Sequence, residues 1–384
     1  LPGNVPVLAT TATANDRVVN DIVAQLGENL VISRGELIRE SLAIQVIKLQ
    51  KKEDRLAWLA ENIEKIPGSG VVYCLTKADC DLVTDWLNEN DIKSEKYYAD
   101  ISKEYKAIIL DKFQKNEIKV LVATVAFGMG YDKPDIGFVI HFQRPANIVS
   151  YYQQIGRAGR GIELAYAILL CGEEDEHINQ YFINSAFPTE KDMNIVVDFI
   201  TDNPGKSISE IKGALNIRAN RVEKTLKYLN VGDDIYTEDV NRKKCYYKSA
   251  KKWKPDLERS EGITAIRYKE MQDMDEFTKQ KGCYMKYIAE KLDDVNAKVC
   301  GKCSNCKGLI FDETVGAETV QRAQQFIKSK FGVIEPRKQF PDKTKIEDEY
   351  QFKSGIVLSN YADAGYGMAV QKGKYLDGYF SDEL

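Results

Sequence analysis

The chain has 384 residues, of which 43% are hydrophobic and 29% are charged, as is usual for soluble globular domains. Its formal net charge of −4 gives no general sign of nucleic-acid binding, so any such surface must be local. The sequence has neither the ~20-residue apolar run of a membrane span nor a secretory signal. It also begins without Met. We therefore expect a piece of a longer protein from a reducing, cytoplasmic compartment, where clustered cysteines bind metal.

Apolar strands and amphipathic helices alternate through the first half of the chain. A strand running into a loop is expected at 5–14, followed by a helix at 15–26 that Gly27 closes. The further expected strands are 70–75, 94–99, 119–124, 137–142 and 165–171, and the further expected helices are 77–90, 103–117 and 147–160. This alternation predicts an α/β fold with a doubly wound parallel sheet, whose functional loops lie at the carboxyl ends of the strands.

A helical pattern replaces this alternation after about residue 186. Two short helices, at 207–217 and 218–231, precede a hairpin that turns near Asn241, which is a winged-helix pattern. The basic residues that could contact a nucleic-acid backbone here are Arg218, Arg221, Lys224, Arg242 and Lys243. A packing module with solvated basic faces would give the same pattern, and both interpretations stay open.

A cluster of four cysteines follows a long charged helix at 258–282. Its members are Cys283, Cys300, Cys303 and Cys306. Four thiolates without a histidine favour a closed, tetrahedral and structural Zn²⁺ site. The alternatives are an iron–sulfur cluster, although the fourth Cys-Pro of ferredoxin motifs is absent, or cysteines without metal. The other four cysteines lie in apolar surroundings and are expected to be buried thiols.

A glycine-containing loop follows one of the apolar strands. In VLVATVAFGMGYDKPD, Gly128 and Gly130 come directly before Asp132. Such a loop can turn backbone amides toward phosphate, and the carboxylate can orient a ribose hydroxyl or a partner arginine. A plain turn is the commoner explanation of the glycines when this segment is taken alone.

The segment YYQQIGRAGR lies about two dozen residues farther on. If the expected helix ran through it, Gln153, Arg157 and Arg160 would share one face. Arginines that project from one face suit a polyphosphate, because the guanidinium fork matches phosphate oxygens. The two segments together predict a phosphate-facing site.

ATTATA (9–14), VVYCLTKADC (71–80) and the two segments above follow the order of helicase motifs III to VI. Together with the cysteine spacing they resemble the RecQ family of ATP-dependent DNA helicases over residues 1–308. The resemblance implies a second RecA-like lobe, preceded by the end of a first lobe. It also implies 3′-to-5′ unwinding of single-stranded, forked or partly duplex DNA in replication, recombination and repair. The implied cofactors are Zn²⁺, ATP and Mg²⁺, and the implied location is the bacterial nucleoid.

The resemblance assigns roles to residues by position. Arg160 would be the arginine finger, with Arg157 and Gln153 in the same catalytic network. The implied nucleotide-binding residues are Gly128, Gly130, Asp132, Arg157 and Arg160, and the implied DNA-binding residues of the lobe are Thr11, Thr13, Thr76, Lys77 and Thr124. The expected organisation is the end of the first lobe at 1–30, the second lobe at 31–186, a winged-helix-like unit at 187–250, a zinc module at 251–310 and an extension or linker at 311–384.

The sequence also departs from the RecQ pattern. Tyr98 and Asp100 stand where His and Gly are usual, Asp132 replaces an Asn, and Gly161 follows the arginines in place of an acidic residue. The winged-helix-like unit precedes the cysteines rather than following them. The tail weakly resembles a linker toward a phosphoribosyltransferase-like domain.

ATP hydrolysis in this class needs a P-loop and an acidic Mg²⁺ motif. PGKS (204–207) and DEH (175–177) imitate parts of these motifs, but the first joins two helices and the second follows motif VI. We therefore expect the chain to be inactive alone, with ATP shared with the missing first lobe. The alternatives are a zinc and winged-helix DNA-binding module with a non-catalytic lobe, and a DEAD-box-type RNA helicase. The intact arginines disfavour the first alternative, and the cysteine module disfavours the second.

Overall fold

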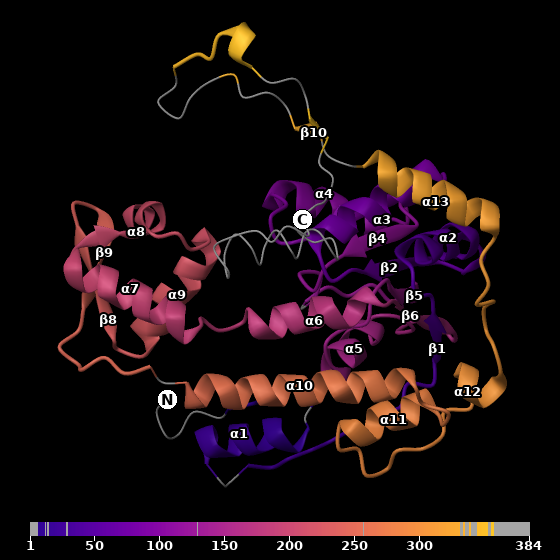
Figure 1. Ribbon diagram of the computed structural model, residues 1–384. Coiled ribbons are helices and arrows are strands. Elements are labelled where there is room, and N and C mark those ends of the chain that lie inside the picture. Colours follow the sequence, from indigo (N-terminus) through magenta and orange to yellow (C-terminus); the bar gives the residue numbers. More distant parts are fainter. Residues whose placement is uncertain are drawn as a thin grey trace. The chain divides into compact units, whose positions relative to one another are not determined.

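The computed structural model describes residues 7–11, 13, 15–27, 30–128, 130–255 and 257–330, with the short pieces 333–334, 338, 344–351 and 355–356 (Figure 1). The chain divides into two compact units, which are described separately. The first contains Leu1–Ile178 and Glu270–Lys330, and the second contains Asn179–Lys269 and Phe331–Leu384. The weak linker-like tail at 361–384 lies outside the described residues. Within the described part, no helix combines the length and the apolar character needed to cross a bilayer.

A six-stranded parallel sheet forms the centre of the first unit. Its strands are β1 (Leu42–Lys48), β2 (Ser69–Tyr73), β3 (Ser94–Tyr97), β4 (Val120–Ala123), β5 (Ile136–His141) and β6 (Ala165–Cys171). Their order is β1-β6-β5-β2-β4-β3, and each neighbouring pair is parallel. Most strand residues are buried, because helices cover both faces. The predicted α/β fold with a doubly wound parallel sheet is confirmed.

The helices of the first unit are sorted between the two faces of the sheet. One face carries α4 (Lys103–Gln114), α5 (Ile148–Ile155), the end of α10 (Glu258–Thr278) and α11 (Tyr284–Lys291). The opposite face carries α2 (Lys52–Asn62), α3 (Lys77–Glu89) and α13 (Ala317–Ser329). The remaining helical segments are α1 (Asp16–Leu26), η1 (Ile63–Lys65), α12 (Ser304–Lys307) and the first half of α6 (Glu174–Asn184), whose second half belongs to the second unit.

Residues 309–330 fold back onto the α2 and α3 face, and Figure 1 shows α13 lying beside these helices. The Trp58 indole donates to the carbonyl of Asp312 over 2.8 Å. The Phe326 ring packs against Trp86 with centroids 5.1 Å apart. The beginning of the expected extension at 311–384 is therefore part of the core of the first unit.

Two expectations about local structure are wrong, and three elements were not predicted. The strand expected at 5–14 does not form in its described part, since residues 7–11 are exposed and pair with no described strand. The helix expected at 147–160 stops at Ile155. The unpredicted elements are β1, α2 and α6. Gln45 interrupts the apolar run of β1, and its buried amide bonds to the backbone of Ile310 and Phe311 instead of to solvent.

The second unit has the predicted winged-helix topology. Its helices are α7 (Glu190–Asp202), α8 (Ile208–Ala214) and α9 (Ala219–Val231), and its sheet contains β7 (Lys206–Ser207), β8 (Ile235–Val240) and β9 (Lys243–Lys248) in the antiparallel order β7-β9-β8. The hairpin turns at Asn241 and Arg242, whose φ values of 52° and 63° suit a two-residue hairpin turn. The short elements β10 (Val333–Ile334), η2 (Asp348–Tyr350) and β11 (Gly355–Ile356) follow.

Candidate functional site

Helix α5 brings two of the predicted motifs together in the first unit. Asn147 caps its start by accepting from the Ser150 amide over 2.8 Å. Gln153 projects from this helix and donates to the Thr13 hydroxyl over 3.0 Å. The Thr13 amide in turn donates to the Thr11 hydroxyl over 3.2 Å. Predicted motif VI thus contacts predicted motif III directly, although they are far apart in the sequence.

The two arginines lie in the turn after α5 rather than on its face. The helix ends because Gly159 has a left-handed φ of 70° and its amide donates to the carbonyl of Ile136 at the edge of β5 over 3.1 Å. The Gly161 amide similarly donates to Pro134 over 2.8 Å. The expectation that Gln153, Arg157 and Arg160 share one helical face is therefore wrong, and each side chain takes its own direction.

Arg157 packs against the glycine loop. Its guanidinium carbon lies 5.5 Å from the centre of the Phe127 ring, and one of its terminal nitrogens donates to the carbonyl of Tyr131 over 3.4 Å. A Cβ added to Gly128 would lie 3.2 Å from the carbonyl oxygen of Val125 and 3.9 Å from the other terminal nitrogen of Arg157, so the loop backbone is what favours glycine here. The Nε of Arg157 is buried and has no hydrogen-bond partner among the described residues.

Arg160 forms an ion pair with Asp132, at 2.7 Å. Both side chains are accessible, with 39% and 72% of their surfaces exposed, so the pair is open to competition by another anion. The Nε of Arg160 also donates to the carbonyl of Gly156 over 3.3 Å. Between Gly128 and Asp132, Gly130 has a φ of 86°, which favours glycine at that position. The predicted nucleotide-facing residues thus lie on two adjacent loops.

Thr76 and Lys77 begin α3 at the carboxyl end of β2. The Thr76 hydroxyl donates to Asp79 over 2.6 Å and accepts from the Asp79 amide over 3.0 Å, which caps the helix. Lys52 and Gln143 also donate to Asp79. Burial opposes ionisation, but Lys52 and these hydrogen bonds keep the pKa of Asp79 below its ordinary value. A buried anion therefore holds Thr76 in place, a relationship that no sequence spacing revealed.

The predicted DNA-contacting residues of the lobe make further local contacts. Lys77 forms an exposed ion pair with Asp100, the residue that departs from the RecQ pattern. The Thr124 hydroxyl accepts from the Ala126 amide over 3.3 Å. Tyr98, the other departure in this segment, hydrogen-bonds to Asp81 over 3.2 Å. Asp100 thus supplies a negative charge beside Lys77 that the usual glycine would not.

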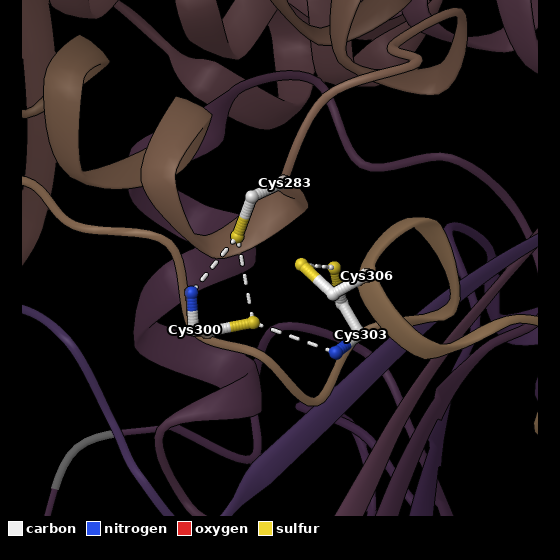
Figure 2. A group of neighbouring side chains, drawn as sticks. All are labelled: Cys283, Cys300, Cys303 and Cys306. Atoms are coloured by element: carbon white, nitrogen blue, oxygen red, sulfur yellow. Dashed lines mark hydrogen bonds between the residues drawn. The ribbon is translucent and has the colours of Figure 1, made fainter.

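The four clustered cysteines meet in space, as Figure 2 shows. Their sulfur atoms all lie within 4.8 Å of one another, and the Cys283–Cys300 and Cys303–Cys306 sulfur pairs are each 3.4 Å apart. A tetrahedron of sulfurs about 2.3 Å from a central zinc has edges of about 3.8 Å, so a small contraction or expansion of this set would hold the ion. The arrangement predicted from the spacing is confirmed as a possible metal site.

The cysteines are anchored to the sheet of the first unit. Cys283 caps α11, whose Met285 and Ile288 are fully buried, and Cys303 is buried in the same apolar cluster as Cys171 of β6. The hydrogen bond with Cys303, together with burial, raises the pKa of Cys300 to about 12, whereas that bond lowers the pKa of Cys303. The cysteines outside the cluster are buried free thiols, as predicted.

The basic residues of the second unit are not equally available. Arg221 pairs with Asp192 and also reaches Thr189, and Lys224 donates to the carbonyl of Ser185 over 2.8 Å. Arg242 and Lys243 are exposed at the hairpin tip. Arg218 begins α9 and is partly buried. The tip of the hairpin is therefore the more accessible part of the predicted nucleic-acid surface.

The two segments that imitate helicase motifs have structural roles. PGKS (204–207) joins α7 to α8, and Ser207 forms a capping box with Glu210. In DEH (175–177), Asp175 is buried and accepts from the Gly172 and Arg144 amides over 2.9 and 3.0 Å. Burial raises the pKa of Asp175 to about 6, against the opposing effect of Arg55. Both segments thus make local structural contacts.

Comparison with known proteins matches residues 53–161 to the helicase conserved C-terminal domain. Protein R290 of Acanthamoeba polyphaga mimivirus, named as an ATP-dependent RNA helicase, is 40% identical over 47% of this chain and 33% of its own length. ATP-dependent DNA helicase Q-like 4B of Arabidopsis thaliana is 38% identical over 43% of this chain and 14% of its own. ATP-dependent DNA helicase RecQ of Bacillus subtilis is 33% identical over 48% of this chain and 31% of its own.

This chain spans a third or less of the length of these three relatives. The matched domain begins in α2 and ends at Gly161, so it contains the glycine loop and both arginines of the candidate site. Several of the similar proteins are RecQ-type DNA helicases, including the RecQ-like helicase blm-1 of Caenorhabditis elegans. By its fold, its motif contacts and these matches, the chain is similar to the C-terminal portion of RecQ-like helicases.

Proposed function

We propose that this chain is the second motor lobe, with its accessory modules, of a RecQ-like helicase that couples ATP hydrolysis to 3′-to-5′ unwinding of DNA in replication, recombination and repair. Single-stranded and forked DNA are the proposed substrates, and ATP with Mg²⁺ is shared with a first lobe. We place the enzyme in the cytoplasm, on the nucleoid. The observation that carries the proposal is the contact of Gln153 with Thr13, which joins motif VI to motif III.

The geometry around the arginines supports an ATP-facing role. Arg160 is held by Asp132, yet both groups are exposed, so the guanidinium can exchange a carboxylate for a phosphate of the same charge sign. Arg157 is held more tightly, against Phe127 and the Tyr131 carbonyl. We assign Arg160 as the arginine finger and Arg157 as the residue that shapes the glycine loop beside it.

We propose that Cys283, Cys300, Cys303 and Cys306 hold one structural Zn²⁺. The compact set of sulfurs supports a single ion over an iron–sulfur cluster, because the several metal atoms of a cluster separate its thiolates more widely. All four ligands are cysteines, so a bound zinc has no open position for catalysis. Its contribution is to fix α11, α12 and the loop between them.

Hydrolysis of ATP by the protein expressed from its whole gene tests the motor assignment. We expect Arg160→Ala to lower the turnover stimulated by single-stranded DNA by a factor of 10³ or so, the lower end of the range for arginine fingers. Arg322→Ala is the control, because Arg322 lies on α13 and bonds to Asn90. Unchanged turnover in Arg160→Ala would refute the assignment.

The choice of nucleic acid is tested with the same preparation. The mimivirus relative is named as an RNA helicase, so single-stranded RNA is the relevant competitor. We expect DNA to stimulate ATP hydrolysis more strongly than RNA of the same sequence, and strand separation to require a 3′ single-stranded tail. Stronger stimulation by RNA would favour the RNA-helicase alternative.

Metal analysis of the purified chain tests the zinc assignment. We expect one zinc and no iron per chain, with the metal lost in Cys303→Ser because a tetrahedral set loses its most buried ligand. Cys171→Ser is the matched control, since that cysteine is buried nearby but is not in the cluster. Iron with visible absorption would replace this assignment with a cluster.

A further inference from the structure

One segment of the first unit is held on two sides. This connecting segment, residues 16–41, runs from the start of α1 to the residue before β1. On one side of it lies the α11–α12 loop, residues 292–303, which contains two of the four clustered cysteines. On the other side lie α5 and the turn after it, which carry the motif VI residues.

Two neighbouring aspartates of the α11–α12 loop accept hydrogen bonds from the connecting segment. Asp293 accepts from the amide of Asp16, the first residue of α1, over 2.8 Å. This amide has no partner within its own helix, so a carboxylate there satisfies an otherwise unpaired donor. Asp294 accepts from the Leu37 amide over 3.0 Å through one oxygen and from the Asn296 amide over 2.9 Å through the other.

The loop adopts a special backbone conformation to present these carboxylates. Asp293 has a φ of 63°, which is uncommon for a residue with a side chain. The far end of the loop is fixed at Cys300 and Cys303, and between them Lys302 donates to the carbonyl of Glu40. The loop thus contacts the connecting segment at its first residue and at two residues near its end.

Residues of motif VI and of the turn after it also hydrogen-bond to the connecting segment. The Tyr152 hydroxyl of α5 donates to the Leu37 carbonyl over 2.7 Å. Ser41 donates to the carbonyl of Gly159, between the two motif arginines, over 2.7 Å. Leu37 therefore has its amide bound by Asp294 and its carbonyl bound by Tyr152, so one backbone unit joins the cysteine module to motif VI.

We propose that Asp293 and Asp294 are positioning residues that use the cysteine module to hold the connecting segment against motif VI. The inference rests on the proposed function, in which this segment joins the ATP-binding first lobe to the lobe that carries Arg160. Metal bound by the cysteines then acts on catalysis through the path of the chain between the lobes. Neither aspartate touches ATP or DNA in this scheme.

Hydrogen–deuterium exchange of the 384-residue chain tests the proposal directly. In Asp294→Ala, we expect exchange at the Leu37 amide and across 30–41 to quicken at least tenfold, with β2 and the metal content unchanged. Tyr152→Phe, which removes the other bond to Leu37, should quicken the same region. Lys298→Ala is the control. The ion pair of Lys298 with Glu36, at 3.9 Å, is exposed and should contribute little to holding the connecting segment.

An unchanged exchange rate at residues 30–41 in Asp294→Ala would overturn the proposal. An equal rise in the exchange rates of residues 30–41 and of β2 would also overturn it, because it would mean general destabilisation. In the protein from the whole gene, Asp294→Ala should lower kcat for ATP hydrolysis at least fivefold with KM for ATP within twofold. A change in KM for ATP with an unchanged kcat would contradict the positioning role. If Arg160→Ala leaves turnover intact while Asp294→Ala frees the segment, the proposed function fails and the positioning role stands.

Discussion

Gln153 donates a hydrogen bond to Thr13 over 3.0 Å. This contact links motif VI to motif III, although five of the six strands of the sheet lie between them in the sequence. Gln153 is exposed, whereas Thr13 is only 4% exposed, so the contact joins a surface side chain to a buried hydroxyl. The resemblance to RecQ helicases placed Gln153 among the catalytic residues and Thr13 among those near DNA. Their contact gives the two roles one physical connection.

A double-mutant cycle measures this connection. We expect Gln153→Ala and Thr13→Val each to destabilise the chain, with a coupling free energy of about 0.5–1.5 kcal/mol between them, the range for a hydrogen bond between neutral groups. Urea unfolding of the two single variants and the double variant gives the value. Strict additivity would show that the contact contributes nothing in solution.

The buried histidine of β5 predicts sensitivity to acid. Burial lowers the pKa of His141 from 6.5 to about 4, although its hydrogen bond to Gln154 opposes the shift. The unfolded chain therefore binds a proton between pH 6.5 and 4 that the folded chain excludes, and stability falls as the pH falls through this window. From pH 7 to 5 the loss is about 2 kcal/mol, and His141→Leu should lack it when urea midpoints are compared.

Asp175 has the opposite effect on how stability depends on pH. Because burial raises its pKa to about 6, its contribution to stability is present below pH 3.8 and is lost as the pH rises through 6. Acidification from pH 7 to 5 thus gains about 1–2 kcal/mol at this site, which offsets part of the loss at His141. Asp175→Asn should make the unfolding midpoint depend more steeply on pH than in the wild type, and a flatter curve would contradict the assignment.

Removing the ring of Phe326 should destabilise the first unit strongly. This side chain on α13 is 4% exposed and packs against Trp86. We expect Phe326→Ala to cost about 3–5 kcal/mol, because a large buried ring leaves a cavity. The exposed neighbour substitution Lys328→Ala serves as the control. A cost below about 1 kcal/mol, measured by chemical unfolding, would mean that α13 is not part of the cooperative core.

The wing and the helix of the second unit should respond differently to charge removal. Arg242→Ala with Lys243→Ala removes two exposed charges, so we expect weaker DNA binding and a salt slope reduced by one to two units, with little change in stability. Arg221→Ala should instead reduce stability, because it leaves Asp192 unpaired. Fluorescence anisotropy at several salt concentrations and thermal unfolding separate the two effects. An unchanged salt slope in the wing variant would support the packing-module interpretation.

Patterns that depend on local sequence were predictable, and contacts between distant segments were not. The alternation of apolar strands and helices predicted the parallel sheet, and the cysteine spacing predicted a cluster that does assemble. The end of α5 at Ile155 depends on backbone bonds from Gly159 and Gly161 to residues near β5, which no periodicity reveals. The pair of Arg160 with Asp132 is likewise set by the tertiary fold.

The missed strand β1 shows the same limit. Its run LAIQVIK contains a glutamine, which weakens an apolar pattern, yet Gln45 is fully buried because it bonds to a segment more than 260 positions later. The catalytic, nucleotide-binding and DNA-binding roles predicted for residues of both units remain predictions.

The bonds between Gln45 and residues 310–311 also bear on solubility. β1 lies at one edge of the sheet, and a long apolar edge invites pairing with another chain. Residues 310–312 and α12 lie against this strand and its neighbour α2, so they shield the edge. A shorter protein ending before Leu309 would lose the part of this cover that residues 310–312 supply, and we expect it to aggregate more readily during expression even where each remaining element can still form.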